Sequence, residues 1–451
     1  MTHVFAYAPH IETYQDMKNT YIYIIVLLLC LTGLQAQPVI TPDIPSVKGY
    51  QVKVKTTQPY KTLYLTGHYG SQRYILDSVA VRKGKATFKS KAATPCGVYT
   101  ITPNKPEQIT SHVLRNNDMD IILNKDNKFV LNMQDLTMEV SEENRLMHDI
   151  IYKTPSEEQS LRSREVKETA PQAFVSKYLM AAYGAKTKPG MSYPNLMRQY
   201  ASVTDLTEPR LLCAPTPLFT HLEYTLTSDD FQYTDTLIRF MDFLLNRPAA
   251  PAVRNYLIST IFQTLDVHNP DYDPVLIHLY DKYDHSWIEE GREGRYKRKI
   301  DNLRKIVPGA QIPELISHDK DGKAHSTNEI KNKYTVLWFW DPDCDHCQEM
   351  TPVLHKMYQE NADKWDFEVF AVEVNDDHDR WMAFSNQHQL WDWTNLSTSM
   401  GDQNLDFIEY FDIMTTPVIF LIDNSNKHTI IARQITLNEL EHFFETNQEK
   451  K

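Results

Sequence analysis

The chain has 451 residues, of which 41% are hydrophobic, so it is long enough for about three domains of roughly 150 residues, each with a buried core. The formal net charge is −12, and the sequence contains no long basic run. Because phosphate binding needs clustered Lys and Arg, these values argue against nucleic acid as a partner.

The N-terminal segment predicts export. Residues 21–34 form an apolar run of 14 residues, shorter than the roughly 20 that a membrane-spanning helix needs. A weakly basic stretch precedes this run and the small residue Ala36 ends it, which indicates a secretory signal peptide over 1–36, with 1–16 an over-extended start. The alternative is an uncleaved membrane anchor. We expect a protein of the periplasm or cell envelope, with no stable membrane span after signal cleavage.

Two regions of different character follow. Residues 46–137 contain short runs rich in β-branched and aromatic residues, separated by glycines, which predicts a small antiparallel, sandwich-like all-β domain. Residues 140–305 carry apolar residues at helical spacing, as in 237–244, which predicts an all-α domain. Cys96 lies in the first region and Cys213 in the second, and their spacing does not decide whether they pair or stay free.

Strands and helices alternate over residues 307–449, so we expect a multidomain chain that ends in an α/β domain. The continuous apolar run 333–340 is typical of a strand buried on both faces. The predicted elements after this run are a helix, a strand, a helix, two strands and a closing helix. This order places the start of the first helix at the carboxyl end of a central strand, where open α/β sheets bind their ligands.

The stretch DPDCDHCQEM (341–350) places Cys344 and Cys347 where the first strand meets the first helix. A helix that begins at or just after Cys344 offers free amide groups and the positive end of its dipole, which favour the Cys344 thiolate. Cys347 lies one turn further and suits the resolving role, within disulfide reach. His346 adds a donor or partial positive charge that stabilises the reduced form, which makes the couple more oxidising.

A zinc site is the main alternative for this cysteine pair. Structural zinc usually takes four ligands, with a second C-x-x-C or a His pair completing the set. The chain has five cysteines and no second C-x-x-C, and the histidines of this region are scattered without ligand spacing. We therefore expect no metal and no cofactor other than the redox-active disulfide Cys344–Cys347.

The sequence WFWDPDCDHCQEMTP (338–352), followed by Thr416-Pro417 in TTPVIFLID, resembles the thioredoxin superfamily, in particular its exported TlpA/ResA-type thiol–disulfide oxidoreductases. Pro352 matches the proline that kinks the first helix of that family. The resemblance implies that Thr416-Pro417 forms a cis peptide, packs against the sulfurs and offers backbone groups to an extended substrate. The two upstream regions are similar to those before thioredoxin-like modules in exported Bacteroidetes proteins.

Two positions depart from this family pattern. The glutamate usual three residues after the second cysteine is replaced by Met350, although Glu349 lies one residue earlier, about 100° round the helix. The buried acid on the central strand of thioredoxin is replaced by Trp338. Glu373, at the end of the second strand, is a candidate substitute acid or base, and the alternative is an exposed strand-end charge.

The sequence therefore predicts an exported thiol–disulfide oxidoreductase that acts on protein disulfides and thiols and exchanges electrons with a redox-partner protein. His346 favours the oxidant or isomerase direction, and the reductase direction stays open. A peroxidase is disfavoured because it would use a lone cysteine rather than an adjacent pair. The alternative outside the enzymes is a cell-envelope binding or assembly module that uses the thioredoxin domain as a scaffold.

Overall fold

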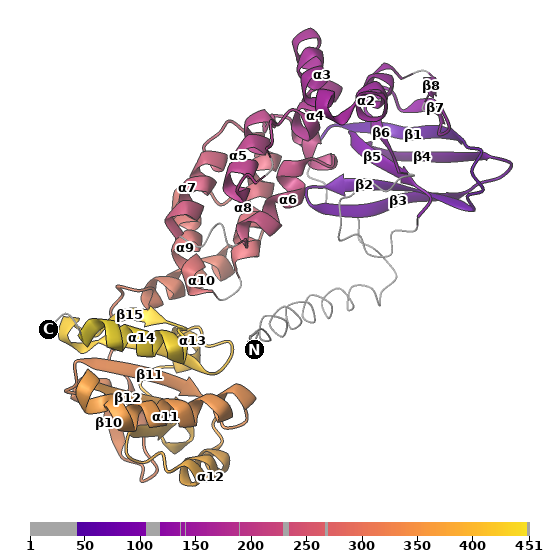
Figure 1. The fold of residues 1–451 in the computed structure, drawn as a ribbon. Helices are drawn as coiled ribbons and strands as arrows, with labels where there is room; N and C mark the ends of the chain where they lie inside the picture. The colour runs from indigo at the N-terminus through magenta and orange to yellow at the C-terminus, as the bar shows by residue number, and fades with distance from the viewer. Residues whose placement is uncertain are drawn as a thin grey trace, which may run out of the picture. The chain divides into compact units, whose positions relative to one another are not determined.

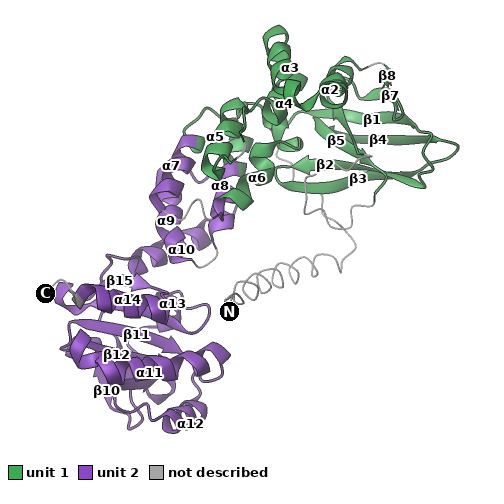
Figure 2. Cartoon of the chain, viewed as in Figure 1, with its two compact units in different colours: residues 1–225, 244–256 green, residues 226–243, 257–451 purple. Residues whose placement is uncertain are grey.

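The computed structural model describes residues 43–104, 118–135, 137–139, 141–188, 190–228, 234–266 and 269–448. The expected signal peptide over 1–36 lies outside these residues. The chain divides into two compact units, one of residues 1–225 with 244–256 and the other of residues 226–243 with 257–451 (Figure 2). The division runs through the helical region, so the three-part domain scheme stays a prediction.

Within the described part of the first unit, the strands form two four-stranded sheets (Figure 1). One sheet consists of β4 (Lys85–Pro95), β1 (Ser46–Lys55), β7 (Lys128–Asn132) and β8 (Thr137–Glu139), in that order. The other consists of β3 (Gln72–Ala80), β2 (Thr62–Tyr69), β5 (Gly97–Thr102) and β6 (Met119–Leu123). Apolar residues from both sheets, among them Val52 and Leu65, share one buried core.

The pairing of β1 with β7 differs from the sequence prediction. These two strands are parallel, with Val52 opposite Phe129, whereas we expected a purely antiparallel domain. The period-two pattern of a strand defines which side chains face the core but not the direction of the neighbouring strand. The direction follows from the path of the chain between β6 and β7.

The middle of the chain is helical. Its helices are α2 (Glu142–Lys153), α3 (Ser156–Thr169), α4 (Phe174–Tyr183), α5 (Tyr193–Val203), α6 (Pro217–Leu226), α7 (Thr234–Leu245), α8 (Pro251–Leu265), α9 (Asp273–Lys282) and α10 (Glu293–Ile306). The apolar stripe expected over 237–244 is fully buried, which confirms the helical period in α7. Cys96 and Cys213 are both buried and both free thiols.

The second unit contains, in its described residues, a seven-stranded sheet with the order β10-β9-β13-β12-β11-β14-β15. The strands are β9 (Ile316–His318), β10 (Ala324–Ser326), β11 (Tyr334–Trp340), β12 (Phe367–Glu373), β13 (Thr394–Ser397), β14 (Val418–Asp423) and β15 (Thr429–Arg433). β11 is parallel to β12 and antiparallel to β14. All residues of β11 are buried, as expected for a strand covered on both faces.

Helices cover this sheet on both faces (Figure 1). They are α11 (Asp345–Trp365), α12 (His378–His388), α13 (Phe407–Tyr410) and α14 (Leu437–Gln448). Trp338 and Trp340 lie on one face of β11, in a core cluster that includes residues of α11, α12 and α14. Phe339 lies on the opposite face, with its ring 6.0 Å from that of Phe407 in α13. Pro352 lies inside α11, as the resemblance implied.

The strand β13 was missed, so the predicted element order was wrong at this point. Its four residues read Thr-Asn-Leu-Ser and contain no apolar run that would indicate a strand. Three of the four are nevertheless buried, because their polar groups find partners inside the domain. Trp381 Nε1 donates to Asn395 Oδ1 at 3.0 Å, and Asn395 Nδ2 donates to Ser385 Oγ at 2.9 Å.

Candidate active site

The cysteine pair lies at the carboxyl end of β11. Cys344 is the N-cap residue of α11 and has an extended backbone, so the helix starts directly after it, as predicted. The backbone N–H of Cys344 donates to the carbonyl oxygen of Asp341 at 3.2 Å, and the backbone N–H of Gln348 donates to that of Cys344 at 3.0 Å. The turn from Asp341 to Cys344 thus fixes the first sulfur at the N-terminal end of the helix.

The two thiols have different surroundings. Cys344 is partly exposed, whereas Cys347 is fully buried, and both are free in this structure. The pKa of the Cys347 thiol is raised to about 12, mainly by burial; contact with Cys344 contributes to this shift, and hydrogen bonds with the Asp341 backbone and with Thr416 oppose it. Cys347 therefore holds its proton at neutral pH and needs a base before it can act as a nucleophile.

A proline loop lies against the first sulfur. The Thr416–Pro417 peptide bond is cis, which confirms what the resemblance implied. The Cys344 thiol donates to the carbonyl oxygen of Thr416, with 3.2 Å between Sγ and oxygen. The loop comes close because Phe339, near the end of β11, pairs with Val418, the first residue of antiparallel β14.

Glu373 is buried, so the alternative of an exposed strand-end charge is wrong. Its side chain is 0% exposed, and it accepts hydrogen bonds from Ser397 Oγ at 2.6 Å and from the backbone N–H of Asn375 at 2.5 Å. Burial raises the pKa of the Glu373 carboxyl, although these hydrogen bonds oppose the shift. The strand β13, which the sequence did not predict, supplies Ser397.

Several contacts connect this carboxyl with the cysteine pair. Glu373 pairs directly with Trp340 in the parallel β11–β12 ladder, so both side chains point to the same face of the sheet. Trp340 belongs to the same core cluster as Cys347. Asp341 follows Trp340; its charge raises the pKa of Glu373, whereas its backbone hydrogen bond lowers the pKa of Cys347. The buried Glu373 carboxyl and the buried Cys347 thiol therefore both lie at the carboxyl ends of the central strands β11 and β12.

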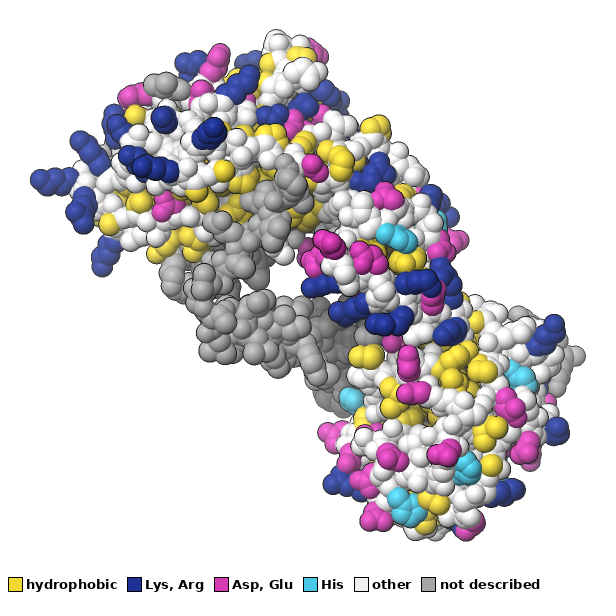
Figure 3. Space-filling model, turned by 180° about the vertical axis from the view of Figure 1, so that it is seen from behind, with side chains coloured by type: hydrophobic (Ala, Val, Ile, Leu, Met, Phe, Trp, Pro, Cys, Tyr) yellow, Lys and Arg dark blue, Asp and Glu magenta, His cyan; other side chains and the backbone are white. Residues whose placement is uncertain are grey.

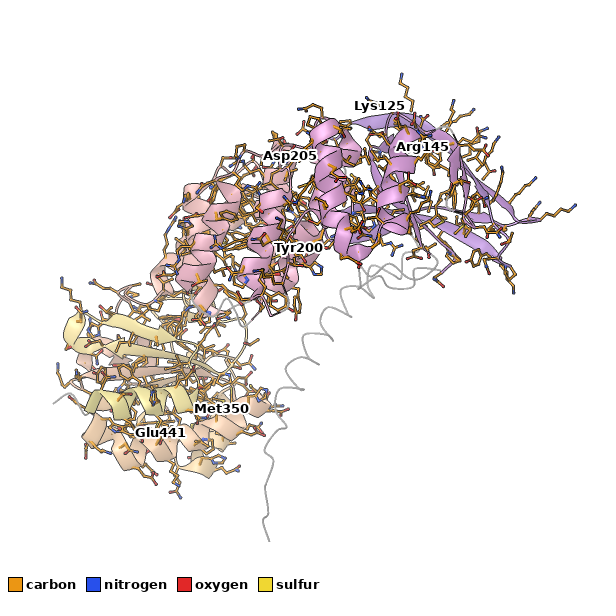
Figure 4. The ribbon with its side chains drawn as sticks, turned by 45° about the horizontal axis from the view of Figure 1, so that its top comes forward. Lys125, Arg145, Tyr200, Asp205, Met350 and Glu441 are labelled. Atoms are coloured by element: carbon orange, nitrogen blue, oxygen red, sulfur yellow. The ribbon has the colours of Figure 1, made fainter. Side chains whose placement is uncertain are left out.

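The other predicted residues lie on the surface of α11. His346 and Glu349 are exposed on its first turns. Met350 is half-buried and packs against the core cluster (Figure 4). The position that carries a glutamate in the resembling family is thus occupied here by an apolar side chain that covers the core.

One residue near the cysteines was missed by sequence reasoning. Arg380 of α12 forms ion pairs with Asp343, directly before Cys344, and with Asp377, the N-cap of α12. Its side chain is 60% exposed, so these pairs contribute little to stability, but they link the loop before α11 to α12. No local pattern indicates such a contact between two elements more than 30 residues apart.

In the part of the chain that the structure describes, no group of three or more His, Cys, Asp or Glu side chains is arranged so that it could hold a metal ion. In the same residues, no helix combines the length and apolar character needed to cross a membrane.

This sheet order, with a cysteine pair that starts a helix and a cis-proline against its first sulfur, is the arrangement of the thioredoxin fold. The model of the thioredoxin-like family matches residues 332–428. The chain belongs to the thioredoxin superfamily through this domain. A second model, a domain of unknown function (DUF4369), matches residues 50–147 in the β-rich region.

Several named proteins are similar to the C-terminal part. A domain of a possible thiol-disulfide isomerase from Cytophaga hutchinsonii is 30% identical, with 32% of this chain and 98% of that chain covered and a TM-score of 0.29. The thioredoxin domain of a thiol-disulfide oxidoreductase from Bacteroides vulgatus is 26% identical, with 31% and 97% covered and a TM-score of 0.28. A thioredoxin-like protein from Haemophilus influenzae is 22% identical over 30% of this chain and 77% of its own.

Proposed function

We propose that this protein is an exported thiol–disulfide oxidoreductase that acts on protein disulfides and thiols in the periplasm or cell envelope. The observation that carries the proposal is the contact of 3.2 Å between the Cys344 thiol and the carbonyl oxygen of Thr416, beside the buried thiol of Cys347. An extended partner that pairs with the backbone at Thr416 would present its sulfur to Cys344. The relatives named as thiol-disulfide oxidoreductases support the same class.

The reaction is thiol–disulfide exchange in two steps. The Cys344 thiolate attacks one sulfur of a substrate disulfide; that S–S bond breaks, and the departing sulfur leaves as a thiolate that takes up a proton. Cys347 then loses its proton and attacks the Cys344 sulfur, which forms the Cys344–Cys347 disulfide and releases the second substrate sulfur. Two electrons pass from the protein to the substrate, and a redox-partner protein returns them. The oxidised form runs the same steps in reverse.

We assign Glu373 as the acceptor of the Cys347 proton. A thiol with a pKa of about 12 ionises too rarely at neutral pH to resolve the mixed disulfide without a base. The carboxyl of Glu373 lies at the end of β12, next to the end of β11 that precedes the cysteines. Its raised pKa lies closer to that of the Cys347 thiol, which makes the carboxylate a stronger base for this proton. Ser397 Oγ and the Asn375 N–H hold the carboxyl in place.

The direction of electron flow depends on how far the reduced form is stabilised. His346 lies in the first turn of α11, one residue before Cys347, where a positive charge or a donor favours the thiolate form of the pair. We therefore propose that the couple is more oxidising than that of thioredoxin and that the protein works as an oxidant or isomerase.

Reduction of insulin by the mature chain tests the proposed class. We expect the wild type to accelerate precipitation of the insulin chains in the presence of dithiothreitol, and Cys344→Ser to abolish this activity. Cys96→Ala, which removes a buried thiol of the β-rich region, serves as a control and should retain it. Equal rates for wild type and Cys344→Ser would favour the alternative, a binding or assembly module that uses the thioredoxin domain as a scaffold.

A further inference from the structure

One face of the β-rich region is covered with lysines. In the sheet β4-β1-β7, alternate residues point into the core, and the others point to solvent. In the regular part of the ladder beyond the bulge of β1 (residues 51–55, 85–89 and 128–132), five of the outward residues are exposed lysines, and none of the outward residues of these three strands is acidic. These five define the lysine face: Lys53, Lys55, Lys85, Lys89 and Lys128.

The strand register brings these lysines together. Lys55 lies directly opposite Lys85, and Lys89 and Lys128 flank Gln51 on its two sides. Adjacent strands are about 4.8 Å apart, so the five lysines are neighbours on one face of three strands. Like charges directly opposite each other in a sheet are destabilising, so the Lys55–Lys85 pair opposes folding. Its one acidic neighbour in the described part of the sheet is Glu139 of β8, 3.4 Å from Lys55.

The charge of this region is opposite to that of the rest of the chain. Residues 46–104 contain ten Lys and Arg and a single acidic residue, Asp77, whereas the whole chain has a net charge of −12. Residues 307–448 contain 25 Asp and Glu against nine Lys and Arg. Figure 3 shows Lys and Arg side chains gathered over the β-rich unit. The positive charge is therefore concentrated on one part of the protein and is not a general solubilising feature.

We propose that the lysine face docks on an anionic phospholipid bilayer. The five lysines are exposed on one face of the sheet, and their long side chains allow the ammonium groups to reach a surface of headgroups together. Lysine is a compact, hydrated charge suited to diffuse attraction, and the outward residues of the three strands include no arginine for bidentate recognition and no aromatic residue for base stacking. A planar lipid surface thus fits better than a nucleic acid. The proposal uses the envelope location of the proposed function but no step of its thiol chemistry.

Co-sedimentation with lipid vesicles tests the proposal. The probe is the mature chain from Gln37, with vesicles of phosphatidylcholine alone or mixed with phosphatidylglycerol. We expect binding only to the anionic vesicles, and a decrease as NaCl is raised. Each lysine near an anionic surface contributes about fivefold in partitioning, so K53Q/K85Q/K89Q should weaken binding roughly a hundredfold.

Three lysines of the thioredoxin domain provide the matched control. K323Q/K331Q/K356Q removes the same charge from exposed positions and should leave vesicle binding unchanged. Circular dichroism and insulin reduction of K53Q/K85Q/K89Q should match the wild type, so that loss of binding is separated from loss of folding and from failure of the redox proposal. Equal binding to neutral vesicles, equal losses in both triple variants, or binding to heparin or DNA but not to anionic vesicles would overturn the proposal.

Discussion

The thiol of Cys344 donates a hydrogen bond to the carbonyl oxygen of Thr416, although 72 residues separate them in the chain. The two meet because β11 ends where the antiparallel strand β14 begins. Because a backbone carbonyl can also accept a hydrogen bond from an incoming extended chain, we expect this loop to contact both the cysteine and its substrate.

Trapping of the mixed disulfide follows from the separate roles of the cysteines. In Cys347→Ser the first attack can occur but the resolving thiol is absent, so a covalent complex with an oxidised protein substrate should accumulate. Non-reducing electrophoresis of the variant with a disulfide-bonded substrate measures it. The double variant Cys344→Ser/Cys347→Ser should form no such complex; a complex of equal yield there would mean that another thiol, such as Cys96, reacts.

Replacement of Glu373 tests the proton acceptor. Because the Glu373 pKa is raised by burial, the carboxyl becomes a base only as the pH rises through that value, and the resolving rate of the wild type should rise with it. Glu373→Gln should slow resolution about tenfold to a hundredfold and remove this limb of the pH profile. Stopped-flow measurement of mixed-disulfide decay against pH is the readout.

The exposed Glu349 provides the comparison for Glu373. It is the rival acid on α11, and Glu349→Gln should leave the rate and the pH profile unchanged. The reverse pattern, with Glu349→Gln slow and Glu373→Gln normal, would assign the proton transfer to the helix. Circular dichroism of both variants excludes a general loss of structure.

The midpoint potential of the Cys344–Cys347 couple tests the proposed direction of electron flow. We expect a value above that of thioredoxin, which is about −270 mV, because His346 stabilises the reduced form. Titration against glutathione, followed by thiol labelling, gives the value. His346→Ala should move the potential downward, whereas His442→Ala, an exposed histidine of α14, should not. A wild-type value at or below that of thioredoxin would mean that the protein is a reductase.

The buried ion pair of Arg433 and Asp273 should carry a large stability effect. Arg433 of β15 and Asp273 of α9 are 1% and 4% exposed and bonded to each other. Burial raises the pKa of Asp273, and Arg433 opposes this shift. Arg433→Met leaves the carboxylate buried and unpaired, so we expect a loss of about 3–5 kcal/mol in urea unfolding, greater as the pH rises through the Asp273 pKa.

Two further variants show whether the loss in Arg433→Met comes from the broken ion pair or from altered packing. Asp273→Leu combined with Arg433→Met should recover most of the lost stability, because no charge is then left in the core. Lys297→Met breaks the exposed pair with Asp301 on α10 and should change the stability little, because solvent screens both charges. If Arg433→Met were as mild as Lys297→Met, the buried pair would contribute little to folding.

Asp120 of β6 should make the stability of the first unit pH-dependent. The pKa of this carboxyl is about 6 because of burial, although Thr100, which donates to it at 2.7 Å, and Arg73 oppose the shift. The pKa of Asp120 is higher in the folded than in the unfolded protein, so its contribution to stability is fully present when the pH is below the unfolded-state pKa of about 4. The free energy of unfolding should therefore fall as the pH rises from about 4 to about 6 and then level off. The fall is at most about 3 kcal/mol.

Asp120→Asn should remove this pH dependence. Above pH 6 its free energy of unfolding should not show the decrease that the wild type shows. Urea unfolding across the pH range, monitored by circular dichroism, is the measurement. Asp126→Asn, in the loop between β6 and β7, is the control and should keep the slope. A slope that survives in Asp120→Asn would place its origin in another group of the same cluster.

Local signals in the sequence were enough for the cysteine pair and the elements beside it. The apolar run of β11 and the start of α11 after Cys344 were predicted, because strand burial and helix capping act over a few residues. The cis peptide at Thr416-Pro417 was implied by the resemblance to the thioredoxin superfamily. The short strand β13 was missed, because its polar residues are buried only through partners such as Trp381.

The sequence by itself determined that a dithiol starts a helix in an α/β domain, since these are properties of neighbouring residues. Only the tertiary structure decided which carboxyl is buried at the same end of the sheet. Glu373 became a buried acid because the register of β12 turns it to the same face as Trp340 and because β13 brings Ser397 to it. The lysine face was decided in the same way, since Lys55 and Lys85 are neighbours only through the pairing of β1 with β4. Burial and charge density are sums over elements distant in the chain, and no local pattern contains them.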